Sequence, residues 1–181
     1  MNKLYVFSGA SGVGKSTVLG QIMANRTDLC FSVSATTREP RPGEVDGESY
    51  YFINKDRFLE MIREDAFVEY DEHMGNYYGT PKFQLDEKLE KGSVVLDIEP
   101  NGAFNVKKWR PDAVLIFIAP PDLEELERRL RGRGDTSEDQ IRLRQDRVRW
   151  EMEQSKKYDH IVINDQVETC VNKILAIMNE Q

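Results

Sequence analysis

The chain has 181 residues, of which 39% are hydrophobic and 31% charged, and its formal net charge is −7. This composition is typical of one globular unit with a substantial core. The acidic balance argues against a general binder of nucleic acid or of anionic membranes, and no apolar run approaches the ~20 residues of a membrane span. Two cysteines without metal-ligand spacing and the lack of a signal-peptide pattern lead us to expect a cytoplasmic protein.

The N-terminal elements predict a phosphate-binding loop. The apolar run LYVF (4–7) predicts a buried strand, GASGVGKST (9–17) follows it, and 15–26 has a helical pattern. The loop matches G-x-x-x-x-G-K-[ST], in which backbone N–H groups and the N-terminus of a helix surround phosphate oxygens. Lys15 is expected at the β- and γ-phosphates, Ser16 at Mg²⁺ and Thr17 at the α-phosphate. The predicted nucleotide-binding residues are Gly9, Ala10, Ser11, Gly12, Val13, Gly14, Lys15, Ser16 and Thr17. An ordinary glycine turn before a helix is the alternative.

The next region, from Phe31 to Pro81, has a different pattern. Short alternating apolar runs, several prolines and glycines, and the paired tyrosines Tyr50–Tyr51 and Tyr77–Tyr78 predict a small antiparallel insertion. A helical stretch at 54–64 lies within it, and a helix at 81–91 follows it. We therefore predict a core domain and an insertion, with boundaries at 1–33 and 82–181 for the core and 34–81 for the insertion.

The remainder of the chain alternates strands and helices. Continuous apolar runs such as VVLDI and VLIFI are typical of parallel strands that helices cover on both faces. The prediction is therefore an α/β protein with a doubly wound, mostly parallel sheet. The predicted strands are 94–98, 114–118 and 160–164, and the predicted helices are 101–108, 122–132, 137–157 and 166–179.

Asp97 ends the run VVLD, at the carboxyl end of a predicted central strand. Active groups of open α/β sheets gather at that edge. An aspartate there can hold Mg²⁺ through water or contact a substrate. As an alternative, it only caps the 99–106 segment.

Two arginines of the insertion can hold a second phosphate. Arg38 and Arg41 lie three apart in TTREPRPG, whose prolines keep the segment extended. Guanidinium groups grip a terminal phosphate in a bidentate manner, and the hydroxyl groups of Tyr50 and Tyr78 can add donors. Taken singly, each arginine fits an ordinary surface position.

Eight arginines fall between Arg128 and Arg149. Because acidic residues alternate with them, a solvated helical surface with ion pairs accounts for several. This interpretation covers Arg128, Arg131, Arg142 and Arg149. The glycines of RGRGDT (131–136) instead favour a mobile lid at about 124–140.

Several blocks, in order, resemble the guanylate kinases. They are SVSATTREPRPGEVDGESYYF (32–52), FVEYDEHMGNYYGT (67–80), LDIEPNGA (96–103), ERRLRGRG (127–134) and YDHIVIN (158–164). With the loop at 9–17, the resemblance covers essentially the whole chain. TTRxPRxGE and NYYGT are specific to that family among kinases with a phosphate loop.

The resemblance implies a P-loop fold, a GMP-binding insertion and transfer of the γ-phosphoryl group of ATP, with Mg²⁺, to GMP. It places Arg38, Arg41, Tyr50 and Tyr78 at the GMP phosphate, and Ser34, Glu69 and Thr80 around the guanine and its ribose. It also places Arg129, Arg133 and Arg144 at the transferring phosphoryl group and Asn164 near the adenine. The implied partners are the small molecules GMP and ATP, with no nucleic acid and no membrane.

The sequence departs from the family pattern at two sites. Glu99-Pro100-Asn101 stands where an aspartate, a variable residue and a glutamine are usual, and Pro81 stands where serine is common. Other functions stay open as alternatives: a kinase for another small phosphorylated acceptor, or a non-catalytic interaction module of the same fold. A GTPase switch is disfavoured because NKDR (54–57) lacks the aspartate of N-K-x-D.

Overall fold

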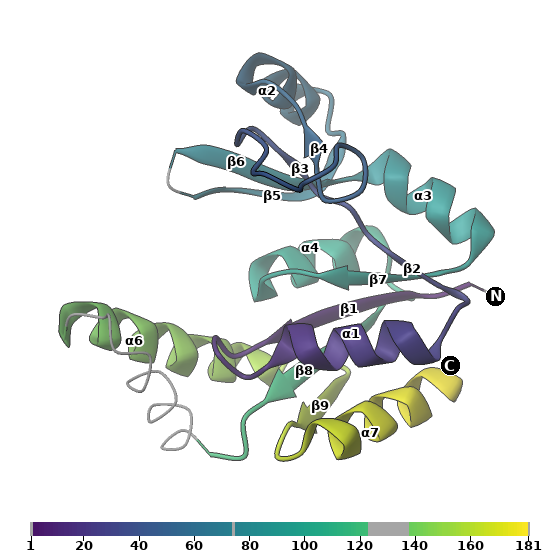
Figure 1. Ribbon diagram of the computed structural model, residues 1–181, viewed down its shortest axis with the longest axis vertical. Coiled ribbons are helices and arrows are strands. Elements are labelled where there is room, and N and C mark those ends of the chain that lie inside the picture. The colour runs from purple at the N-terminus through teal and green to yellow at the C-terminus, as the bar shows by residue number, and fades with distance from the viewer. Residues whose placement is uncertain (1, 74, 123–137, 181) are drawn as a thin grey trace.

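The computed structural model describes residues 2–73, 75–122 and 138–180, and two sheets organise them (Figure 1). The larger sheet has five strands in the order β2-β7-β1-β8-β9, and the smaller has four in the order β4-β3-β6-β5. The larger sheet consists of β1 (Leu4–Gly9), β2 (Leu29–Phe31), β7 (Ser93–Asp97), β8 (Val114–Ala119) and β9 (His160–Ile163).

Every strand pair in the larger sheet is parallel. Parallel strands present their carboxyl ends at one edge, where an α/β protein gathers its functional groups. Helices cover both faces, so the predicted α/β class with a mostly parallel sheet is confirmed. The short edge strand β2 was not predicted, because LCF is too brief to stand out from its neighbours.

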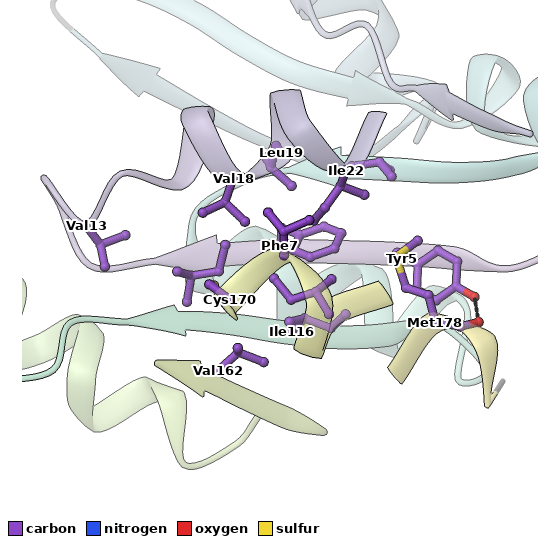
Figure 2. Close-up of a cluster of buried hydrophobic side chains, with 14 of the residues drawn as sticks. Tyr5, Phe7, Val13, Val18, Leu19, Ile22, Ile116, Val162, Cys170 and Met178 are labelled. Atoms are coloured by element: carbon purple, nitrogen blue, oxygen red, sulfur yellow. Dashed lines mark hydrogen bonds between the residues drawn. The ribbon is translucent and has the colours of Figure 1, made fainter. Parts of the chain in front are cut away.

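Helices α1 (Lys15–Asn25) and α7 (Val167–Asn179) cover one face of this sheet. Figure 2 shows their side chains, including Ile22 and Cys170, interleaved with Phe7 and Ile116 of the strands. The Tyr5 hydroxyl donates a 3.1 Å hydrogen bond to the Met178 carbonyl in the same cluster. This packing fixes the β1–α1 junction, where the glycine loop lies.

The opposite face packs against α3 (Lys82–Lys91) and α4 (Pro100–Trp109). Leu85 of α3 and Val106 of α4 are fully buried against Val6 and Phe117 of the strands. A long helix, α6 (Glu138–Ser155), passes close to the carboxyl ends of the strands (Figure 1).

The smaller sheet consists of β3 (Ala35–Thr36), β4 (Tyr51–Phe52), β5 (Phe67–His73) and β6 (Asn76–Pro81). It is antiparallel at β3–β6 and β5–β6, whereas β3 and β4 pair in parallel across a long connection. The helix α2 (Lys55–Arg63) covers it and gives it a core of its own, in which the rings of Phe58 and Phe67 stack at 4.4 Å.

The helices expected at 54–64, 81–91, 101–108 and 166–179 correspond to α2, α3, α4 and α7, with ends that differ by a few residues. The helix expected at 122–132 and most of the lid at 124–140 lie outside the described residues. Among the helices that the structure describes, none has the length and apolar character needed to cross a membrane.

Candidate active site

A cavity of about 1000 Å³ lies between the two sheets, at the carboxyl edge of the larger one. It is lined by residues 9–17 of the glycine loop and by Ser34, Tyr50, Glu69, Asp71, Tyr78, Asp97, Ile98, Glu99, Arg147 and Glu151. The cavity therefore brings together the predicted phosphate loop and residues of the insertion that are far away in the sequence.

The glycine loop has the backbone shape that an anion site needs. Gly12 and Gly14 have φ angles of 83° and 87°, in the left-handed region that favours glycine. Gly14 is also the N-cap of α1, so the positive end of the helix faces the cavity. Val13 points instead into the core beside Val18 (Figure 2), which anchors the loop from behind.

Lys15 and Asp97 form an ion pair inside the cavity, and each side chain is 24% exposed. Burial lowers the pKa of Lys15 to about 8, while the negative charge of Glu151 opposes that shift. The alternative role for Asp97 as a helix cap does not hold, because Glu99 is the N-cap of α4. Asp97 instead faces the ammonium group that is expected to meet phosphates.

Glu69 lies on the insertion side of the cavity and is oriented by two neighbours. The Thr80 hydroxyl donates a 2.6 Å hydrogen bond to Glu69 Oε1. On its other side is Gly102 of α4, where an added Cβ would lie 3.0 Å from Glu69 Cγ. Burial raises the pKa of the Glu69 carboxyl above its usual value. Glu69 is therefore an oriented carboxylate of the cavity wall and not a freely solvated side chain.

Of the four insertion residues that are predicted to bind a second phosphate, the two tyrosines line the cavity and the two arginines do not. Tyr50 and Tyr78 line it, with ring centroids 6.1 Å apart. Arg38 lies over the Tyr50 ring at 5.5 Å and forms a two-pronged ion pair with Glu44, at 2.8 and 3.0 Å. The exposed Arg41 donates its backbone N–H to the same carboxylate. Glu44 thus holds together the segment that carries both arginines.

Two residues predicted to contact a ligand are buried beside the cavity. Thr80 is fully buried, and its hydroxyl contacts Glu69. Asn164 is 4% exposed, and its amide donates a 2.7 Å hydrogen bond to the Val13 carbonyl. It supports the loop from beneath. The contacts of Thr80 with the guanine and of Asn164 with the adenine stay predictions.

The lid arginines cannot be placed in this geometry. Arg129 and Arg133 lie outside the described residues. Arg144 belongs to α6, but its side chain is likewise outside the described part of the chain. Their predicted contacts with the transferring phosphoryl group stay predictions.

A family model for guanylate kinase matches residues 1–181. The chain belongs to the guanylate kinase family. It is 46% identical over 180 residues to a guanylate kinase of Thermus thermophilus, covering 99% of this chain and 81% of that protein. It is 48% identical over 181 residues to one of Streptococcus thermophilus, covering 98% and 86%.

Solved structures give the same result for the fold. The crystal structure of guanylate kinase from Anaplasma phagocytophilum matches with a TM-score of 0.75 and 30% identity, covering 99% of this chain and 85% of that one. A shikimate kinase from Bacteroides thetaiotaomicron matches at a TM-score of 0.53 and 14% identity, covering 98% of each chain. The latter likeness concerns the fold alone.

Some residues of this guanylate kinase cavity were missed from the sequence. Asp71, Ile98, Arg147 and Glu151 line it, as does Glu99, to which no role was given. Arg147 belongs to the group of eight arginines between Arg128 and Arg149, and that cluster is the signal that could have identified it. Glu151 carried no comparable signal, because only the position of α6 beside the loop makes it part of the site.

Proposed function

We propose that this member of the guanylate kinase family transfers the γ-phosphoryl group of ATP to GMP, giving ADP and GDP, through the cavity between its two sheets. The observation that carries the proposal is that one cavity holds both a complete phosphate loop and the carboxylate of Glu69. Phosphoryl transfer asks the protein mainly to align donor and acceptor and to neutralise charge, so a shared cavity is the main requirement.

The donor half would hold the triphosphate of ATP. Backbone N–H groups of the loop and the N-terminus of α1 favour an anion there. Lys15 would leave Asp97 for the β- and γ-phosphates, and its charge would stabilise the negative charge that develops during transfer. The phosphates would also restore the full charge of a lysine whose pKa burial has lowered to about 8.

The acceptor half would hold GMP. Guanine presents N1–H and its 2-amino group side by side, and the two oxygens of the Glu69 carboxylate can accept both. Thr80 would orient that carboxylate. The GMP phosphate would be bound by the side chains of Tyr50, Tyr78 and Arg38. On binding, the Arg38 guanidinium would exchange its ion pair with Glu44 for one with the phosphate. Arg41 and Ser34 would complete the acceptor site.

The residues present are compatible with Mg²⁺. The described part of the chain has no group of three or more His, Cys, Asp or Glu that could hold a metal by itself. Mg²⁺ bound to a nucleotide needs few protein ligands, since phosphates and waters supply the others. Ser16 in the first turn of α1 is the candidate ligand, with Asp97 acting through water. When bound, the ion would supply positive charge that offsets the charge of the phosphates. A cytoplasmic location remains a prediction.

A coupled assay with ATP and a panel of nucleoside monophosphates tests this proposal. We expect kcat/KM for GMP to exceed that for AMP, CMP and UMP by at least about 10²-fold, because a buried carboxylate left unpaired penalises the wrong base. Preference for another acceptor would favour the alternative of a different small-molecule kinase. Transfer to none of them, with ATP still bound, would favour a non-catalytic module.

A further inference from the structure

The glycine loop is held from the side by a buried carboxylate of α6. The side chain of Glu151 is 4% exposed, and its Oε2 accepts a 2.9 Å hydrogen bond from the backbone N–H of Ser11. Figure 1 shows α6 beside the loop between β1 and α1, consistent with this contact. Glu151 therefore restrains the first part of the loop, before its two left-handed glycines.

A carboxylate is an unexpected neighbour for a site that binds a triphosphate. It lines the same cavity as the loop, and its charge acts on Lys15 and on the buried hydroxyl of Tyr158. Like charges close together in a partly buried site repel strongly. The carboxylate can remain beside the donor phosphates without weakening their binding only if its charge is balanced.

Arg147 supplies that balance. Its Nε donates a 3.0 Å hydrogen bond to Glu151 Oε1, one helical turn away, and its Nη2 forms an ion pair with Glu99 at the N-terminus of α4. The guanidinium also lies 4.9 Å from the centroid of the Trp150 ring. Arg147 is thus fixed from three directions, with its charge directed at two carboxylates of the cavity wall.

We propose that Glu151 and Arg147 are positioning residues of the donor site, in which Glu151 holds the phosphate loop through Ser11 and Arg147 cancels its charge so that the loop accepts ATP. The inference rests on the ATP-dependent transfer proposed above. Neither residue needs to touch the reacting atoms. The pair acts on donor affinity and leaves the acceptor half of the cavity unaffected.

The test compares ATP binding to the GMP-free protein with steady-state KM and kcat for both substrates. Arg147→Ala leaves a buried carboxylate without its cation, so we expect ATP affinity to fall about tenfold with little change in KM for GMP. Arg149→Ala is the matched control, because Arg149 lies on the same helix with a 66% exposed side chain and only a 3.9 Å approach to Asp146. The control should alter ATP affinity less than twofold.

The decisive variant is the double substitution Arg147→Ala with Glu151→Gln. The amide oxygen of glutamine can still accept the Ser11 N–H but carries no charge, so ATP affinity should return to within about threefold of the parent. Arg147→Lys, which retains the charge but not the planar fork, should recover part of the loss. Melting temperatures of all variants separate loss of binding from loss of folding.

Several results would overturn the inference. These are an Arg147→Ala variant that matches Arg149→Ala, a double variant with losses that simply add, or a fall in kcat with unchanged ATP affinity. The last would mean that Arg147 touches the transferring group. Because ATP binding is measured without GMP, these outcomes are distinct from failure of the parent to phosphorylate GMP, which would overturn the proposed function.

Discussion

The two halves of the cavity are constructed in different ways. The donor half is a backbone loop between β1 and α1, anchored through Val13 in the largest cluster of buried side chains. The acceptor half consists of side chains on a small sheet whose own core is Ala35, Phe58, Met61 and Phe67. The backbone amides of the donor loop are positioned by the packing of a buried junction and by the contact of Ser11 with Glu151, whereas the Glu69 side chain depends on Thr80 and Gly102 for its orientation.

This difference suggests how the two halves respond to change. The donor half should lose catalysis when Lys15 is replaced and ATP affinity when Arg147 is replaced, and it should tolerate replacement of most other side chains. The acceptor half should lose discrimination between bases through small displacements, because side chains define it and few buried contacts support it. Four predictions probe this difference, from the largest expected effect to the smallest.

Replacing Lys15 should produce the largest effect. Lys15→Met removes the charge at the donor phosphates while keeping the length of the side chain, so kcat should fall by about 10³-fold. The ion pair with Asp97 is partly exposed, and the melting temperature should change little. A coupled assay and a thermal melt measure both quantities. Turnover close to that of the parent would mean that Lys15 has no catalytic role.

Replacing Glu69 should affect base choice more than phosphate handling. Glu69→Ala removes both acceptors for guanine, so kcat/KM for GMP should fall about 10²-fold while that for AMP stays level or rises. Thr80→Val, which removes only the hydroxyl that orients Glu69, should show a smaller loss in the same direction. If Glu69→Ala still preferred GMP to AMP as strongly as the parent, another group of the protein would be recognising the base.

The donor half of the cavity should lose function at high pH and the acceptor half at low pH. Because burial lowers the pKa of Lys15 to about 8, the free enzyme loses this charge as pH rises through that value, and kcat/KM for ATP should decline there. Burial raises the pKa of Glu69, so its carboxylate becomes protonated at a higher pH than usual as pH falls, and KM for GMP should increase on the acid side.

Separate pH profiles for the two substrates measure this division. Glu69→Gln should remove the acid limb of the GMP profile and leave the alkaline limb of the ATP profile in place. A GMP profile that keeps its acid limb in Glu69→Gln would assign that titration to another group.

The smallest effect should come from adding one methyl group beside Glu69. A Cβ at Gly102 would lie 3.2 Å from Glu69 Oε2 and also 3.2 Å from Ile98 Cδ1, so the carboxylate must shift by a few tenths of an ångström. Gly102→Ala should therefore raise KM for GMP by about three- to tenfold, with KM for ATP unchanged. Gly20→Ala is the control, because nothing lies within 4 Å of the added atom. Gly20→Ala should leave both KM values unchanged and raise stability by about 0.5–1 kcal/mol.

If Gly102→Ala affected both substrates equally, α4 would support the entire cavity and not Glu69 alone. The contrast between the two halves would then be weaker than the contacts suggest.

The sequence by itself determined the donor loop and the fold class. A loop that binds phosphate through its backbone needs glycine at set positions, and parallel strands covered on both faces need continuous apolar runs. Gly14, Lys15 and Ser16 could therefore be assigned from spacing alone, and Asp97 from its place at the end of a strand. The chemistry of the insertion suggested Arg38, Arg41, Tyr50 and Tyr78 as a phosphate site. The residues around the guanine, Ser34, Glu69 and Thr80, came from resemblance, since their side chains converge from separate segments.

Only the tertiary structure decided which residues face the cavity and which stand behind them. Thr80 and Asn164 are buried beside the cavity, while Glu151 and Arg147 belong to the cavity wall. These outcomes depend on the position and rotation of whole elements, such as α6 against the loop and α4 against β5, and are set by packing between segments far apart in the chain. Local sequence determines what a residue can do chemically, whereas packing determines which neighbours it meets.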